Sequence, residues 1–89
     1  MREKTVKVEL FFAAGCSKCA EAREALRETA LSSGRVEWQE VDIARNPNRA
    51  VDAGVVATPA VAIDGKLVFK TMPTAAALQN AIRARTGKG

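Results

Sequence analysis

Two cysteines three positions apart are the residues of this sequence best suited to do chemistry. Cys16 and Cys19 are the only cysteines among 89 residues, and they lie in the stretch AAGCSKCAEAREAL. A pair with this spacing can be a redox-active dithiol, half of a metal site, or two buried apolar neighbours. The chain contains no histidine. This excludes Cys–His nucleophilic catalysis and leaves a closed zinc site, which usually has four Cys or His ligands, short of two.

The segments on either side place the pair at a strand-to-helix junction. Residues 6–12 alternate in polarity and carry β-branched and aromatic side chains, which is typical of a strand. Residues 17–32 are rich in Ala, Glu and Arg and predict a helix, which Gly34 is expected to end as a left-handed cap. With Cys16 at the first helical position, unpaired N–H groups and the helix dipole should lower the pKa of its thiol.

The remaining segments predict the following order: strand 36–43, short helix 46–54, strand 58–64, strand 66–70 and helix 74–85. In the strand 36–43 the apolar positions change phase after Trp38, so we expect a bulge or burial on both faces. The resulting order is β-α-β-α-β-β-α, with one parallel pair and one antiparallel hairpin. It predicts an α/β fold with a four-stranded mixed sheet and helices on both faces, as one domain over residues 1–89.

This order, with CxxC after the first strand and Thr-Pro before the third, resembles the thioredoxin fold in its glutaredoxin-sized form. Small thioredoxin-like proteins known as redox-active disulfide proteins share three motifs with it. These are Gly-Cys-x-x-Cys at 15–19, Gly-Val-x-x-Thr-Pro-Ala at 54–60 and Ile-Asp-Gly-Lys-x-Val at 63–68. The resemblance covers nearly the whole chain. It implies a thiol–disulfide oxidoreductase in which a cis-Pro59 faces the cysteine pair.

Different surroundings of the two thiols predict different roles. Lys18 adds a cation near Cys16, whereas Cys19 lies one turn into the helix and should be more buried. Cys16 is therefore expected to attack a substrate disulfide, and Cys19 to resolve the mixed disulfide. The expected substrate-binding surface consists of Gly15, Ser17, Lys18, Ala57, Thr58 and Pro59.

Several positions depart from the patterns of the families that the chain resembles. Thioredoxins have a buried acid six residues before the first cysteine, where this chain has Leu10. The neighbouring Glu9 should point to the other face of the strand. The features that glutaredoxins use for glutathione are missing, since the CxxC contains no Tyr and residues 71–74 read Thr-Met-Pro-Thr.

Two other classes of function stay open. Two copies of the chain could pool their CxxC motifs around zinc or an iron–sulfur cluster, or the domain could bind partners without catalysis. The redox interpretation requires no metal and no cofactor beyond the Cys16–Cys19 pair. It predicts a monomer that acts on disulfide-containing proteins and is recharged by an unidentified reductase or thiol.

Charge and hydropathy limit the expected partners and the expected location of the protein. The net charge is +4, but basic residues are interleaved with acids and aromatics are few, so nucleic acid is not an expected partner. No stretch approaches the ~20 apolar residues of a membrane span. Charges interrupt the first 15 residues, which do not resemble a signal peptide. We therefore expect a cytoplasmic location, where structural disulfides are rare and a cysteine pair is usually catalytic or metal-binding.

Overall fold

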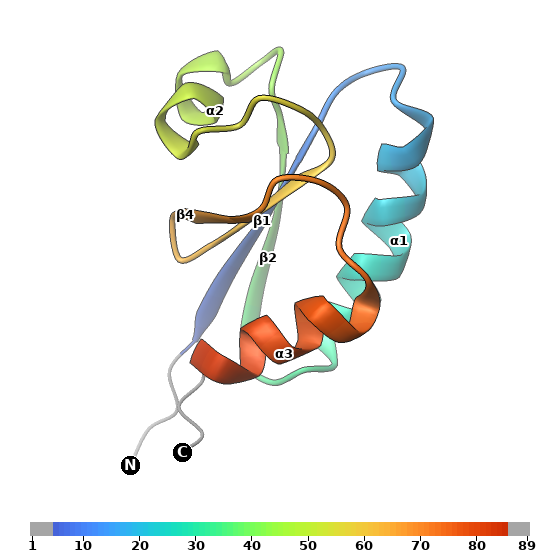
Figure 1. The fold of residues 1–89 in the computed structure, drawn as a ribbon, viewed down its shortest axis with the longest axis vertical. Coiled ribbons are helices and arrows are strands. Elements are labelled where there is room, and N and C mark those ends of the chain that lie inside the picture. Colours follow the sequence, from blue (N-terminus) through green and yellow to red (C-terminus); the bar gives the residue numbers. More distant parts are fainter. Residues whose placement is uncertain (1–4, 86–89) are drawn as a thin grey trace.

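Four strands and three helices make up residues 5–85, the part of the chain that the computed structural model describes (Figure 1). They follow the order expected from the sequence: β1 (Val6–Phe12), α1 (Ser17–Leu31), β2 (Val36–Asp42), α2 (Pro47–Ala53), β3 (Ala60–Ile63), β4 (Lys66–Phe69) and α3 (Ala75–Arg85).

The strands form one mixed sheet in the order β2-β1-β3-β4. β1 pairs in parallel with β2 and antiparallel with β3, and β3 continues into β4 through a tight hairpin. Asp64 and Gly65, at the tip of that hairpin, have φ of +53° and +85°. Positive φ at both central residues is what a two-residue turn of type I′ requires, and Asp-Gly supplies it. β1 is thus an inner strand, and the loop that follows it carries the cysteines.

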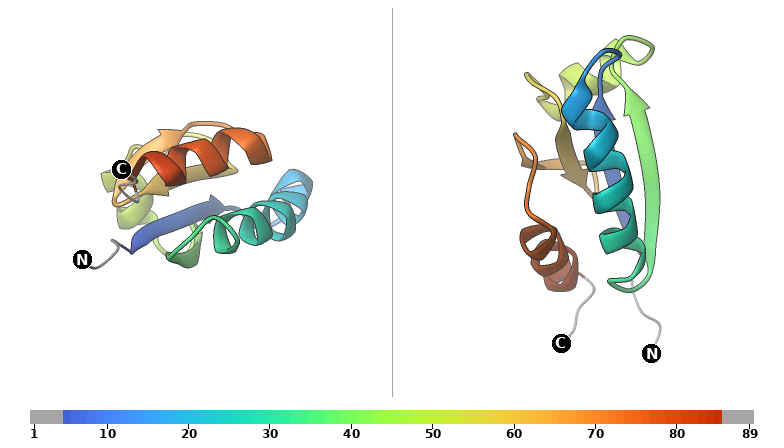
Figure 2. Two further views of the ribbon diagram at one scale, coloured as in Figure 1. Left: turned by 90° about the horizontal axis from the view of Figure 1, so that it is seen from below. Right: turned by 90° about the vertical axis from the view of Figure 1, so that its right-hand side faces the viewer.

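Helices cover both faces of the sheet (Figures 1 and 2). On one face α1 and α3 pack against the strands and against each other, and the larger core lies there, with Leu26, Leu78 and Ile82 fully buried. On the other face Ala50 of α2 packs with Phe11 in a smaller core. Because this face holds mostly alanines and valines around one aromatic ring, α2 has little apolar surface with which to anchor itself.

The phase change in β2 corresponds to burial on both faces. Val36 and Trp38 pack against the core under α1 and α3, whereas Val41 and Ile43 belong to the core under α2. The pairing with β1 runs without interruption along β2, so the alternative expectation of a bulge is wrong. The irregularity lies elsewhere, between β3 and β4, where the register shifts at Val61 and Ala62.

The end of α1 differs from the expected glycine cap. The helix ends at Leu31 and Ser32 is its cap, with a right-handed φ of −90°. The backbone N–H of Ser32 donates to the carbonyl oxygen of Glu28 at 3.1 Å, so the last turn closes without a left-handed residue. Gly34 has a φ of +135° and serves the following turn instead.

α2 lies within the predicted range 46–54 and buries little apolar surface. The helix ends before Gly54, which caps it in the left-handed region. Asn46 precedes its first residue, but the side chain donates to the carbonyl oxygen of Asp42 instead of capping the helix. Ala50 is buried, whereas Val51 is 75% exposed. Neighbouring residues of a helix point about 100° apart, so Val51 turns away from the sheet that Ala50 faces.

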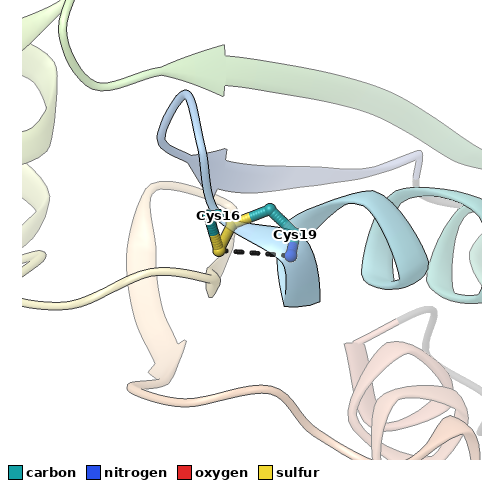
Figure 3. The surroundings of a disulfide bond; sticks show 2 residues. All are labelled: Cys16 and Cys19. Carbon is teal, nitrogen blue, oxygen red and sulfur yellow. Dashed lines mark hydrogen bonds between the residues drawn. A yellow bond between two sulfur atoms is a disulfide. The ribbon is translucent and has the colours of Figure 1, made fainter.

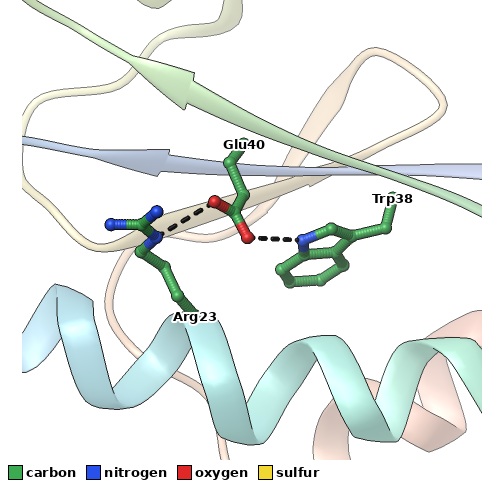
Figure 4. A network of polar contacts seen from close by, with 3 residues as sticks. All are labelled: Arg23, Trp38 and Glu40. Atoms are coloured by element: carbon green, nitrogen blue, oxygen red, sulfur yellow. Dashed lines mark hydrogen bonds and ion pairs between the residues drawn. The ribbon is translucent and has the colours of Figure 1, made fainter.

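A polar network ties α1 to the edge strand β2 (Figure 4). The carboxylate of Glu40 accepts one hydrogen bond from Nε of Arg23 and one from the indole N–H of Trp38, both at 3.0 Å. The Arg23 guanidinium also lies 4.9 Å from the centre of the Phe12 ring. No helix in the described range is long and apolar enough to cross a membrane.

Candidate active site

Cys16 and Cys19 are joined in a disulfide at the start of α1 (Figure 3). Their Cα atoms are 5.2 Å apart, within the range that a disulfide spans without backbone movement. Two intervening residues thus let the two sulfurs meet across one helical turn.

The turn between β1 and α1 sets the position of Cys16. Gly15 has a φ of +82°, a conformation that side-chain-bearing residues rarely adopt. The N–H of Cys16 donates to the carbonyl oxygen of Ala13 at 3.3 Å and closes the turn. Cys16 itself is extended and is the N-cap of α1, with Ser17 as the first helical residue. The helix starts at Ser17, as in the predicted range 17–32. Cys16 therefore precedes the first helical position that was considered for it, and its side chain is free to cap the helix.

The Cys16 sulfur occupies the place of a capping oxygen. It accepts a hydrogen bond from the backbone N–H of Cys19 at 3.2 Å (Figure 3). An N–H aimed at the sulfur, at the positive end of a helix, favours the charged form of a thiol there. Cys19 is only 2% exposed, whereas Cys16 is half-buried. The outer sulfur is therefore the one that a second molecule can reach.

The loop before β3 meets the CxxC motif at a small surface pocket. The peptide bond between Thr58 and Pro59 is cis, as the resemblance implies. Pro59 is buried and Thr58 is half-buried. A pocket of about 280 Å³ is lined by Lys18, Ala57, Thr58, Pro59, Lys70, Thr71 and Met72. The structure thus brings four of the predicted substrate-binding residues together, while Gly15 and Ser17 lie exposed beside Cys16 without lining this pocket.

Three residues of that pocket are absent from the predicted site. Lys70, Thr71 and Met72 lie in the loop after β4. The β3–β4 hairpin brings this loop beside Lys18 of the CxxC motif. Their contribution depends on the return path of β4, which local sequence patterns do not specify.

Glu9 is the one buried charged side chain in the described range, at 4% exposure. It lies on the α2 face of β1, as expected from its position next to Leu10, and forms an ion pair with Arg49 of α2. Its burial and its partner were not expected from the sequence. The Arg49 side chain is half-exposed and covers the carboxylate, so the pair ties α2 to the sheet.

A metal site at the two cysteines would need further ligands beside them. Within residues 5–85, no group of three or more His, Cys, Asp or Glu side chains is arranged so that it could hold a metal ion.

Known proteins resemble the chain in sequence and in fold. Residues 4–83 match the family described as the thioredoxin domain. The thioredoxin of Methanocaldococcus jannaschii is 35% identical over 81 residues, which span 90% of this chain and 95% of the relative. A probable thioredoxin of Methanothermobacter marburgensis is 33% identical over 69 residues, or 76% of this chain and 81% of the relative.

Solved structures show the same fold at lower identity. A mutant thioredoxin from Halobacterium salinarum superposes with a TM-score of 0.80 at 24% identity, covering 94% of this chain and 77% of that one. Mitochondrial thioredoxin 3 from Saccharomyces cerevisiae, in its oxidized form, gives 0.72 at 22% identity, covering 89% and 77%. The family match, the relatives and the disulfide-bonded CxxC agree: the chain belongs to the thioredoxin family and is a thiol–disulfide oxidoreductase.

Proposed function

We propose that this protein reduces or exchanges disulfides in other proteins, with Cys16 as the attacking thiol and Cys19 as the resolving thiol. The observation that carries the assignment is the contrast between the two sulfurs. Cys16 is half-buried at the helix N-terminus and accepts an N–H, whereas Cys19 is 2% exposed. An incoming disulfide can reach the first sulfur, and the second is held where it can attack only its neighbour.

The reaction moves two electrons from the dithiol to the substrate. The Cys16 thiolate attacks one sulfur of the substrate disulfide, so that a mixed disulfide forms and the other substrate sulfur leaves as a thiolate. Cys19 then loses its proton to water or to that leaving thiolate and attacks the Cys16 sulfur. The internal disulfide forms and the second substrate thiolate is released. A reductase or thiol must then return two electrons to the pair.

The substrate segment is expected to lie across Thr58 and Pro59. Proline has no N–H to present to the substrate, and Thr58 is half-buried with its backbone beside the pocket. An extended peptide can pair with such a backbone as an added strand. Gly15, Ser17, Lys18 and Ala57 complete the proposed surface around Cys16.

Single cysteine variants test the assignment. Cys16→Ser should abolish the reduction of a protein disulfide such as that of insulin, because no attacking thiolate remains. Cys19→Ser should lose turnover but accumulate a mixed disulfide with the substrate, visible on a non-reducing gel and cleared by dithiothreitol. The double variant Cys16→Ser/Cys19→Ser should give the circular dichroism spectrum of the wild type, which shows that loss of the thiols does not unfold the protein. Full activity in both single variants, or a mixed disulfide formed by Cys16→Ser, would overturn the roles.

We further propose that the protein acts as a cytoplasmic monomer and needs no bound cofactor. The proposal rests on the cysteine pair, which is complete within one chain, and on the reducing conditions of the cytoplasm, where a cysteine pair is usually catalytic. Light scattering of the reduced protein, with metal analysis of the same sample, tests the monomer and the absence of metal together. A dimer with stoichiometric zinc or iron would favour the metal-binding alternative.

A further inference from the structure

Two lysines frame the pocket beside the disulfide. Lys18, between the cysteines, and Lys70, after β4, both line the pocket that contains Thr58 and Pro59. Both are exposed, and within residues 5–85 neither pairs with a carboxylate. The other lining residues are uncharged. The pocket therefore has a positive potential that no neighbouring side chain neutralises by direct contact.

Acidic side chains predominate on the other side of Met72. Beyond Met72, which lines both hollows, a larger and open hollow of about 680 Å³ is lined by Glu21, Glu24, Glu28, Ala25 and Arg27. The lining thus changes from basic on one side of Met72 to mainly acidic on the other. An anionic group on a substrate is attracted at the pocket and repelled a short distance along α1, so its position relative to the reacting cysteine matters.

We propose that the protein prefers disulfide substrates with an acidic residue beside the reactive cysteine, and that Lys18 and Lys70 recognise this residue. The inference rests on the proposed function, because it requires a peptide that lies across Thr58 and Pro59. A peptide in that position places the residue next to its cysteine over the pocket. Met72, which is 38% exposed, offers an apolar contact for the stem of that side chain.

Lys70 is the better residue to change, since Lys18 lies inside the redox motif and affects Cys16 directly. Lys66 is a matched control, because it is an exposed lysine on the same hairpin but does not line the pocket. The variants Lys70→Gln, Lys70→Glu and Lys66→Gln change the net charge of the chain in known steps. An effect of Lys70 on the pocket can therefore be distinguished from an effect of the net charge of the chain.

The probes are three homodimeric disulfide peptides that differ only in the residue after cysteine, which is Asp, Asn or Lys. The rate constant for oxidation of the reduced protein by each peptide is measured by acid quench and chromatography. The readout is the ratio of the Asp rate to the Lys rate within one variant, which cancels any change in Cys16 reactivity. Exposed charge pairs are weak, so we expect about two- to fivefold between successive peptides at low salt. The ratio should shrink toward one at about 0.5 M salt.

Lys70→Gln should reduce the ratio, Lys70→Glu should reduce it further or invert it, and Lys66→Gln should leave it unchanged. A wild-type ratio near one at low salt would overturn the preference while leaving the oxidoreductase mechanism intact. An equal effect of Lys66→Gln and Lys70→Gln would overturn recognition by this pocket. Failure to reduce any of the three peptides would overturn the proposed function, and this inference with it.

Discussion

The backbone N–H of Cys19 donates a hydrogen bond to the sulfur of Cys16 at 3.2 Å, so the proposed resolving residue also solvates the proposed attacking one. The contact follows from the position of Cys16 as N-cap, where a Ser or Asp oxygen would ordinarily accept the same bond. After reduction this N–H is available to a Cys16 thiolate. The disulfide and the capped helix start are thus two uses of the same local geometry.

The first prediction concerns the thiol of reduced Cys16. Its pKa should lie below the ordinary value of about 8.5, because the N–H, the helix dipole and Lys18 all favour the thiolate. Lys18→Ala should raise this pKa, since the cation of Lys18 near Cys16 is lost. The measurement is the pH dependence of alkylation in a Cys19→Ser background, where Cys16 is the sole thiol. Lys66→Ala is the control, and an unchanged midpoint in Lys18→Ala would show that Lys18 does not tune the thiol.

The second prediction concerns the redox equilibrium and metal. Titration against dithiothreitol or glutathione buffers should show one reversible two-electron transition, in which a tenfold change in the thiol–disulfide equilibrium corresponds to about 30 mV. A chelator should leave the transition unchanged, because the cysteine pair is complete without metal. A midpoint below about −220 mV would mark a reductant, and a higher one would indicate disulfide exchange or coupling to glutathione. A transition that disappears on chelation would contradict the redox interpretation.

The order of the elements could be predicted because each one has a local cause. Alternation in β1, the Asp-Gly turn and the left-handed Gly54 all act over a few residues. The range of α1 was predicted closely but its caps were not, since Cys16 and Ser32 cap the helix through contacts that depend on the exact path of the chain. The sequence likewise indicated two-sided burial in β2, but it could not exclude a bulge.

The candidate site could be predicted only where its residues are neighbours in sequence or belong to a motif. The cysteines and Thr58-Pro59 are each neighbours in sequence and part of a motif. Lys70 and Met72 belong to no motif, and they reach the pocket through the pairing of β3 with β4 and the loop that follows. Glu9 is a similar case. Its burial depends on α2 and Arg49, which lie about forty residues away in the chain.

The third prediction concerns the Glu9–Arg49 ion pair. Arg49→Met should lower the free energy of unfolding by about 1–3 kcal/mol, because it leaves a buried carboxylate without its partner. The double variant Glu9→Gln/Arg49→Met should recover part of that loss, since the uncompensated charge is gone. Urea denaturation of the wild type, both single variants and the double variant gives the coupling energy. Strict additivity would mean that the pair does not contribute to anchoring α2.

The fourth prediction compares the polar network on β2 with the core beneath α1. Leu26→Ala should lower the free energy of unfolding by about 2–5 kcal/mol, because Leu26 is fully buried between α1 and the sheet and its loss leaves a cavity. Glu40→Ala should cost about 1 kcal/mol or less, since the side chains of Arg23 and Glu40 remain 47% and 25% exposed. Urea denaturation can be followed through Trp38, the single tryptophan. Because Trp38 loses its hydrogen bond in Glu40→Ala, circular dichroism should confirm the midpoint. Equal losses in the two variants would mean that the network holds α1 as firmly as the core does.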